Sequence, residues 1–169
     1  RFGMVVPVVF AGSIYEPFFK EIQDQIQKLS LCEQTRMLGF VTPLELQCLY
    51  QLARCVVIPT KYEAGSFPLW EAFLSGVPAA CSNVTSLPAQ AGDAALIFDP
   101  DQPEEMADAI VRLWKDESLR RTLIDRGYQN VARYSWQLTA RTFRAYYRQI
   151  ANRLLTEEDL LLLKAPPLM

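Results

Sequence analysis

The sequence contains no histidine among its 169 residues. This absence excludes Ser-His-Asp triads, Cys-His dyads, histidine metal ligands and a histidine general base. The four cysteines have no CxxC spacing, which favours reduced structural thiols over a metal site. Catalysis must therefore come from carboxylates, from backbone groups, or from residues in another part of a longer protein.

The sequence also lacks a basic surplus and a long apolar run. Seventeen basic residues stand against nineteen acidic ones, so the net charge is -2. A nucleic-acid binder needs excess positive charge to displace counterions from phosphates, and this class is disfavoured. No run approaches the roughly 18 apolar residues of a membrane span, and no signal-peptide pattern is visible. We expect a cytoplasmic protein, and the initial Arg1 in place of Met predicts a piece of a longer or processed chain.

What the sequence does contain is the composition of one globular domain, with 50% hydrophobic and 21% charged residues. Short apolar runs alternate with helical patterns, which predicts right-handed crossovers and a doubly wound, Rossmann-like parallel α/β sheet. The runs expected as strands are 5–10, 35–41, 55–59, 77–81 and 95–98. The segments expected as helices are 16–31, 42–53, 68–75, 104–115, 119–134 and 135–155, followed by a tail over 156–169.

Ligands of such sheets bind beyond the carboxyl ends of the strands. This rule points to four loops. They are residues 12–14, 39–42, 60–67 and 82–86.

The third of these loops carries the sharpest local signal. Glu63 lies in the loop and Glu71 lies eight positions later, inside the next helix, with the small residues Ala64, Gly65 and Ser66 between them. Backbone N–H groups at a helix start suit a phosphate, and a carboxylate accepts hydrogen bonds from vicinal sugar hydroxyls. The pattern has the parts that hold a nucleotide by ribose and phosphates. The alternative is two solvated glutamates beside an ordinary loop–helix junction.

This segment resembles the E-x7-E motif of retaining glycosyltransferases with the GT-B fold, of the group 1 (family-4) type. Further segments between about residues 8 and 153 carry the resemblance. They are Gly39-Phe40-Val41-Thr42 with Glu45-Leu46 and Leu49-Tyr50, Val57-Ile58-Pro59-Thr60, Glu71-Ala72 through Gly76-Val77-Pro78 with Ser82-Asn83, Ser86-Leu87-Pro88 with Gly92-Asp93-Ala94-Ala95 and Asp99-Pro100, and the closing helix 143–150.

The resemblance implies that residues 1–155 form the C-terminal, nucleotide-sugar-binding domain of a two-domain enzyme, whose N-terminal acceptor domain is its partner. It implies that Glu63 faces the transferring sugar as the catalytic carboxylate and that Glu71 binds the ribose hydroxyls. The amides of Gly65, Ser66 and Phe67 match those that hold the distal phosphate.

Four further donor-binding positions follow from the same resemblance. Phe40 and Val41 match the region around the base, and the loop at Gly12 and Ser13 borders the cleft. The donor is then a GDP-, UDP- or ADP-linked sugar, and the block 82–100 resembles relatives that use GDP-mannose. Membrane association is implied only through a missing domain.

The implied reaction moves a hexosyl group from the nucleotide to an acceptor hydroxyl with retained anomeric configuration. The leaving diphosphate needs charge stabilisation, which helix-end amides and an Arg/Lys pair supply in the family, so neither a metal nor another cofactor is expected. That pair belongs to a segment before Val8, and Ala64 stands where the family usually has glycine. We expect this chain alone to bind a nucleotide weakly and to transfer no sugar.

Two alternatives belong to other functional classes. The first is a non-catalytic nucleotide- or protein-binding module, with 160–163 and the aromatic closing helix as an interface. The second, a dinucleotide oxidoreductase, is disfavoured because only Ala11-Gly12-Ser13 follows the first strand, without a GxGxxG motif.

Overall fold

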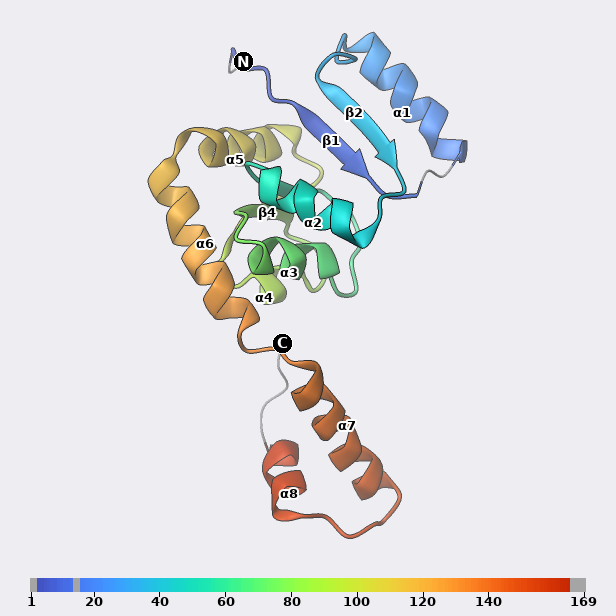
Figure 1. Ribbon diagram of the computed structural model, residues 1–169, viewed down its shortest axis with the longest axis vertical. Coiled ribbons are helices and arrows are strands. Elements are labelled where there is room, and N and C mark those ends of the chain that lie inside the picture. The colour runs from blue at the N-terminus through green and yellow to red at the C-terminus, as the bar shows by residue number, and fades with distance from the viewer. Residues whose placement is uncertain (1–2, 14–15, 165–169) are drawn as a thin grey trace. The chain divides into compact units, whose positions relative to one another are not determined.

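The computed structural model describes residues 3–13 and 16–164 (Figure 1). Arg1, Ile14 of the first predicted ligand loop and the last five residues of the predicted tail lie outside the described residues. The chain divides into two compact units, Arg1–Ala53 and Arg54–Met169.

The first unit contains β1 (Val8–Ala11), α1 (Glu16–Lys28), β2 (Thr35–Gly39) and α2 (Pro43–Leu52). The two strands pair in parallel, with Val8 opposite Thr35. The helix predicted over 16–31 ends earlier, because Ser30 adopts a left-handed φ of 57°. The amide of Leu31 then donates to the Ile26 carbonyl at 2.9 Å and closes the helix end.

A capping box begins α2, as the Thr42-Pro43-Leu44-Glu45 pattern predicts. The Glu45 amide donates to Thr42 Oγ1 at 3.3 Å, and the Thr42 amide donates to Glu45 Oε2 at 2.7 Å. The Thr42 hydroxyl also donates to Glu45 Oε2, and the bonds from the Thr42 amide and hydroxyl lower the pKa of the Glu45 carboxyl, the backbone bond most of all. The start of α2, directly after the predicted base-binding positions, is therefore fixed locally.

The second unit holds the remaining three strands and six helices of the described chain. The strands are β3 (Val56–Ile58), β4 (Ala79–Ser82) and β5 (Ala95–Phe98), and they pair in parallel in the order β3-β4-β5. The helices are α3 (Phe67–Leu74), α4 (Leu87–Ala91), α5 (Pro103–Lys115), α6 (Glu117–Val131), α7 (Trp136–Ile150) and α8 (Glu157–Lys164). The predicted parallel α/β fold is confirmed, with its strands distributed over a two-stranded and a three-stranded sheet.

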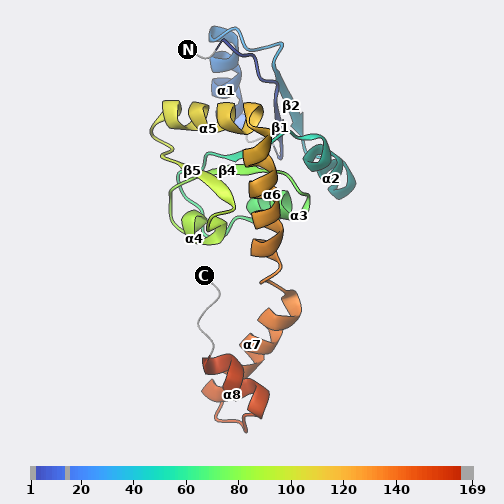
Figure 2. The same ribbon diagram turned by 90° about the vertical axis from the view of Figure 1, so that its left-hand side faces the viewer.

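Helices cover both faces of the three-stranded sheet. Helix α5 lies on one face, and α3 and α4 lie on the other (Figures 1 and 2). The core between the sheet and α5–α6 is formed by Ala80, Phe98, Ala109, Leu113 and Leu123. Because β4 is buried at every residue, its side chains are small throughout and all but Ser82 are apolar, as expected for a central parallel strand.

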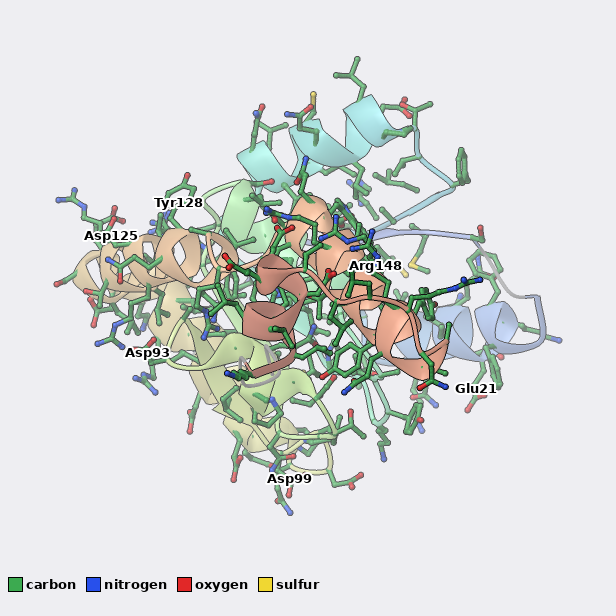
Figure 3. All side chains as sticks on the ribbon, turned by 90° about the horizontal axis from the view of Figure 1, so that it is seen from below. Glu21, Asp93, Asp99, Asp125, Tyr128 and Arg148 are labelled. Atoms are coloured by element: carbon green, nitrogen blue, oxygen red, sulfur yellow. The ribbon has the colours of Figure 1, made fainter. Side chains whose placement is uncertain are left out.

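The segment predicted as a tail forms α8, which packs against α7. Asp159 of α8 is fully buried and lies within 3.1 Å of Arg144 and 2.7 Å of Arg148, which is labelled in Figure 3. The Thr156 amide also donates to this carboxylate, at 2.9 Å. The pKa of Asp159 is held well below its ordinary value, first by the Thr156 amide and then by the Arg148 guanidinium. This ionic cluster, with its carboxylate buried and its two arginines partly exposed, joins the two helices.

No helix in the described ranges 3–13 and 16–164 combines the length and the apolar character that crossing a membrane requires.

Candidate functional site

The loop between β3 and α3 places Glu63 beyond the carboxyl end of β3, a strand whose last residue, Ile58, is buried. The Glu63 amide donates to Thr85 Oγ1 at 3.2 Å, and the Thr85 hydroxyl donates in turn to the Glu63 carbonyl. Ser86 Oγ lies 3.1 Å from the same carbonyl oxygen. Both peptide groups that flank the Cα of Glu63 are thus bonded to the loop between β4 and α4. That loop, residues 83–86, lies within the fourth predicted ligand loop.

The small residues after Glu63 lead straight into the helix that follows. The Gly65 amide donates to Glu63 Oε1 at 3.3 Å, and the Ser66 amide donates to Gln90 Oε1 at 2.9 Å. A Cβ at Gly65 would meet no atom within 4 Å, so the side of the loop at this position is open. Of the three predicted phosphate-binding amides, two therefore already donate within the protein. The third belongs to Phe67, the first residue of α3, where helical N–H groups point outward.

Ser66 is the N-cap of α3, yet its hydroxyl does not cap the helix. The residue is fully buried, and Ser66 Oγ has no hydrogen-bond partner among the residues that the structure describes. The indole N–H of Trp70, one turn further along α3, is also buried without a hydrogen-bond partner among the described residues. Buried polar atoms without partners are uncommon in native proteins, because each costs about 1–3 kcal/mol. The N-terminus of α3 thus carries unused hydrogen-bonding capacity beside the partial positive charge of the helix end.

Helix α3 itself is held rigidly. Leu69, Ala72 and Phe73 are buried, and Phe73 packs against Gly127 of α6. Glu71 lies in the second turn of this helix and is half-buried. The two predicted glutamates therefore come from a bonded loop and from a packed helix within the same unit.

Lys61 lies near the start of this loop. It forms an ion pair with Asp101, which follows β5, and the hydrogen bond that the lysine donates to Asp101 raises the pKa of the lysine. Both side chains are largely exposed, so this pair contributes little to stability.

The four other predicted site residues lie in the first unit. Gly12 has a φ of 140°, which favours glycine, and its amide donates to the Gly39 carbonyl at 2.8 Å. Together with Ser13 it lines a cavity of about 280 Å³. Phe40 is 78% exposed and Val41 is half-buried. The loops after β1 and β2 therefore meet within this unit, as expected for neighbouring parallel strands.

The sequence patterns did not predict that Thr85, Ser86 and Gln90 bond the Glu63 loop. Thr85 and Ser86 lie within the predicted ligand loop 82–86, so the sequence indicated their region but not their role. Gln90 lies in a five-residue helix that local patterns hardly indicate, and glutamine is usually exposed.

The family model described as "Glycosyl transferases group 1" matches residues 4–130. The chain belongs to the group 1 glycosyltransferases. It is 40% identical over 112 residues to the O-antigen chain mannosyltransferase B of Escherichia coli, a match that covers 66% of this chain and 29% of that protein. It is 29% identical over 133 residues to a D-inositol 3-phosphate glycosyltransferase of Corynebacterium urealyticum, covering 78% of this chain and 31% of that protein. The group 1 chain thus spans about 30% of the length of these two relatives.

Solved structures show the same fold at low sequence identity. Sucrose-phosphate synthase from Thermosynechococcus elongatus superposes with a TM-score of 0.77 at 24% identity, over 85% of this chain and 38% of that chain. HepE from Anabaena, solved with UDP-glucose, gives a TM-score of 0.69 at 19% identity, over 76% and 36% of the two chains. The C-terminal domain of a group 1 protein from Francisella tularensis gives a TM-score of 0.63 at 18% identity, over 75% and 86%. The group 1 chain thus has the fold that these glycosyltransferase structures share, including that of the C-terminal domain from Francisella tularensis.

Proposed function

We propose that this chain is the donor-binding domain of a retaining glycosyltransferase that moves a hexosyl group from a nucleoside diphosphate sugar to an acceptor hydroxyl. The observation that carries the proposal is the bonded Glu63 loop, which leads into the N-terminus of α3 at a buried Ser66 hydroxyl that has no partner within the described residues. Hydroxyl and amide donors at a helix N-terminus are the groups that receive an anionic oxygen.

In this proposal the two glutamates have separate roles. Glu71 accepts hydrogen bonds from the ribose hydroxyls, since the two oxygens of a carboxylate match a vicinal diol. Glu63 faces the sugar, where its negative charge favours the positive charge that develops at the anomeric carbon. The Phe67 amide and Ser66 Oγ receive the distal phosphate, and the Gly65 amide joins them once the Glu63 carboxylate turns toward the sugar.

The resemblance to the family assigns four residues of the first unit to donor binding in this proposal. Phe40 and Val41 contact the base, and Gly12 and Ser13 form a donor-binding loop. GDP-mannose is the donor that we favour, which agrees with the mannosyltransferase among the relatives; HepE, by contrast, was solved with UDP-glucose.

The acceptor half is supplied by an N-terminal domain in this proposal. Helix α7 presents Trp136, Tyr147 and Ile150 as largely exposed side chains, a surface that such a domain covers. The isolated chain then binds a donor but transfers no sugar.

A titration panel tests the proposal. The chain is titrated calorimetrically with UDP, GDP and ADP, and with UDP-glucose and GDP-mannose. We expect saturable binding for one base class, and a loss of at least about tenfold in affinity for Glu71→Gln, because a charge-assisted hydrogen bond contributes about 1.5–3 kcal/mol. Glu104→Gln, an exposed glutamate in the first turn of α5, is the matched control. If none of the five compounds binds, the proposal is wrong and a non-catalytic protein-binding module is favoured.

A further inference from the structure

We infer that Thr85, Ser86 and Gln90 are positioning residues that set the orientation of Glu63 and Ser66 toward the donor. None of the three needs to touch the sugar nucleotide, because each acts on the backbone of the loop that does. The inference rests on the proposed function and adds to it the residues that hold the binding loop in its competent geometry.

Thr85 acts on Glu63. Its hydroxyl accepts from the Glu63 amide at 3.2 Å and donates to the Glu63 carbonyl, so one side chain bonds both neighbouring peptide groups. Rotation about the φ and ψ angles of Glu63 would break one of these two bonds. The direction of the Glu63 Cα–Cβ bond is therefore set by Thr85.

The backbone of Thr85 shows that this arrangement is costly. Its φ is 48°, in the left-handed region that glycine and asparagine adopt readily and that β-branched residues disfavour. Glycine would relieve the strain but would supply no hydroxyl. Threonine at this position therefore keeps the hydroxyl contact with Glu63 at the expense of backbone strain. Strain of this kind is concentrated at functional sites.

Gln90 acts on Ser66 in the same way. Its Oε1 atom accepts from the Ser66 amide at 2.9 Å, and Ser86 Oγ lies 3.3 Å from the same atom. Gln90 is 8% exposed, and Asn130 of α6 donates to its carbonyl at 2.9 Å. A continuous path of hydrogen bonds thus runs from α6 through α4 to the N-cap of α3.

Ser86 joins the two arms. Its hydroxyl lies 3.1 Å from the Glu63 carbonyl and 3.3 Å from Gln90 Oε1, so its single hydrogen is available to either acceptor. The loop between β4 and α4 thereby fixes both ends of the Glu63–Ser66 segment. The small residues Ala64 and Gly65 lie between these two fixed points.

The two arms predict different consequences for binding. Loss of the Thr85 hydroxyl misplaces Glu63, so it should affect the additional affinity of a nucleotide sugar over the bare nucleotide. Loss of the Gln90 acceptor misplaces Ser66 beside the phosphate, so it should weaken both ligands alike. A merely structural role would lower the melting temperature without separating the two ligands.

The test measures affinities of the 169-residue chain for GDP and GDP-mannose, or for UDP and UDP-glucose if that base class binds. Thr85→Gly and Gln90→Leu remove the bonding groups, and Thr85→Ser restores the hydroxyl. Two controls in α6 are Thr122→Ala, which removes an exposed hydroxyl, and Gln129→Leu, which removes an exposed amide. Melting temperatures are recorded for every variant.

We expect Thr85→Gly to reduce the affinity for the nucleotide sugar about three- to tenfold, the effect of about one hydrogen bond, while the affinity for the nucleotide is retained. Its melting temperature should stay near that of the wild type, since relief of strain offsets the added freedom of the unfolded chain. Thr85→Ser should restore the affinity. Gln90→Leu should weaken both ligands about three- to tenfold, and the two controls should weaken neither.

Two results would overturn the inference in distinguishable ways. If the wild type binds donors and both Thr85→Gly and Gln90→Leu bind them equally well, the positioning role is wrong while the proposed function stands. If the wild type binds neither nucleotide nor nucleotide sugar, the proposed function and the inference fall together.

Discussion

Replacement of Gly127 by alanine should destabilise the second unit, although it places a better helix former in the middle of α6. A Cβ at this position would lie 2.9 Å from Cδ1, 3.2 Å from Cγ and 3.4 Å from Cβ of Phe73. Real Cβ atoms essentially never approach a carbon as closely as the first of these distances. The Phe73 ring is 2% exposed in the core, so it cannot move away into solvent.

The magnitude follows from two opposing effects. Alanine is favoured over glycine in a helix by about 1 kcal/mol. Overpacking a filled core costs about 1–3 kcal/mol. Because the ring carbon is approached within 2.9 Å, we expect the upper half of that cost and a net loss of about 1–2 kcal/mol, or about 4 °C or more in melting temperature.

Urea denaturation followed by circular dichroism measures this change. Gln129→Ala, at an exposed position of the same helix, is the control and should change the stability by a few tenths of a kcal/mol at most. Phe73→Leu shortens the opposing side chain, so its combination with Gly127→Ala should be more stable than the sum of the two single changes. A Gly127→Ala variant as stable as the wild type, or an additive double variant, would refute the steric reasoning.

Two other predictions concern titratable side chains. The low pKa of Asp159, caused first by the Thr156 amide, gives a stabilisation that is present above its ordinary pKa of 3.8 and is lost as the pH falls below it. The helical circular dichroism signal should therefore decrease below about pH 4, and Asp159→Asn should lose the same signal at neutral pH; an unchanged signal in that variant would contradict the role of the buried charge. Burial raises the pKa of the Cys81 thiol to about 12, whereas Cys32 and Cys48 are exposed. Iodoacetamide at pH 8 should therefore label the exposed pair within minutes and Cys81 only after unfolding, which mass spectrometry of peptides distinguishes.

Local patterns were sufficient to predict most of the second unit. The strand predicted over 95–98 is β5, and the apolar run around 55–59 contains β3. The helix predicted over 68–75 is α3 to within one residue at each end, since Pro68 fits the first turn and Gly76, with a φ of 67°, follows its end. These features depend on chemistry within a few residues of one another.

Elements that depend on distant partners could not be predicted in this way. The segment 156–169 has no strong helical pattern, and α8 is held by arginines of α7 that lie 11–17 residues earlier in the chain. Helix α4 has five residues and is stabilised by the burial of Leu87, Gln90 and Ala91. Its hydrogen bond to Asn130 spans 40 residues, and no spacing rule indicates it.

In the candidate site, too, some features depend on nearby residues and others on distant partners. The positions of Glu63 and Glu71 follow from the order strand, loop and helix, which the local sequence patterns predict. In our inference the direction of the Glu63 Cα–Cβ bond is set by the Thr85 hydroxyl, 22 residues away, and Thr85 has a left-handed backbone conformation that local preferences do not favour.

This division has a physical reason in the proposed function. A loop that lets its backbone approach a phosphate must be built from small residues, and such residues leave the unbound loop free to move. Ordering that loop on binding would reduce the affinity, because the interactions with the ligand would first have to offset the lost freedom. The bonds from Thr85 and Gln90 remove that freedom before the ligand arrives, at the expense of a left-handed threonine and a buried amide. The residues that order this loop for ligand binding, Thr85 and Gln90, therefore lie outside the loop itself.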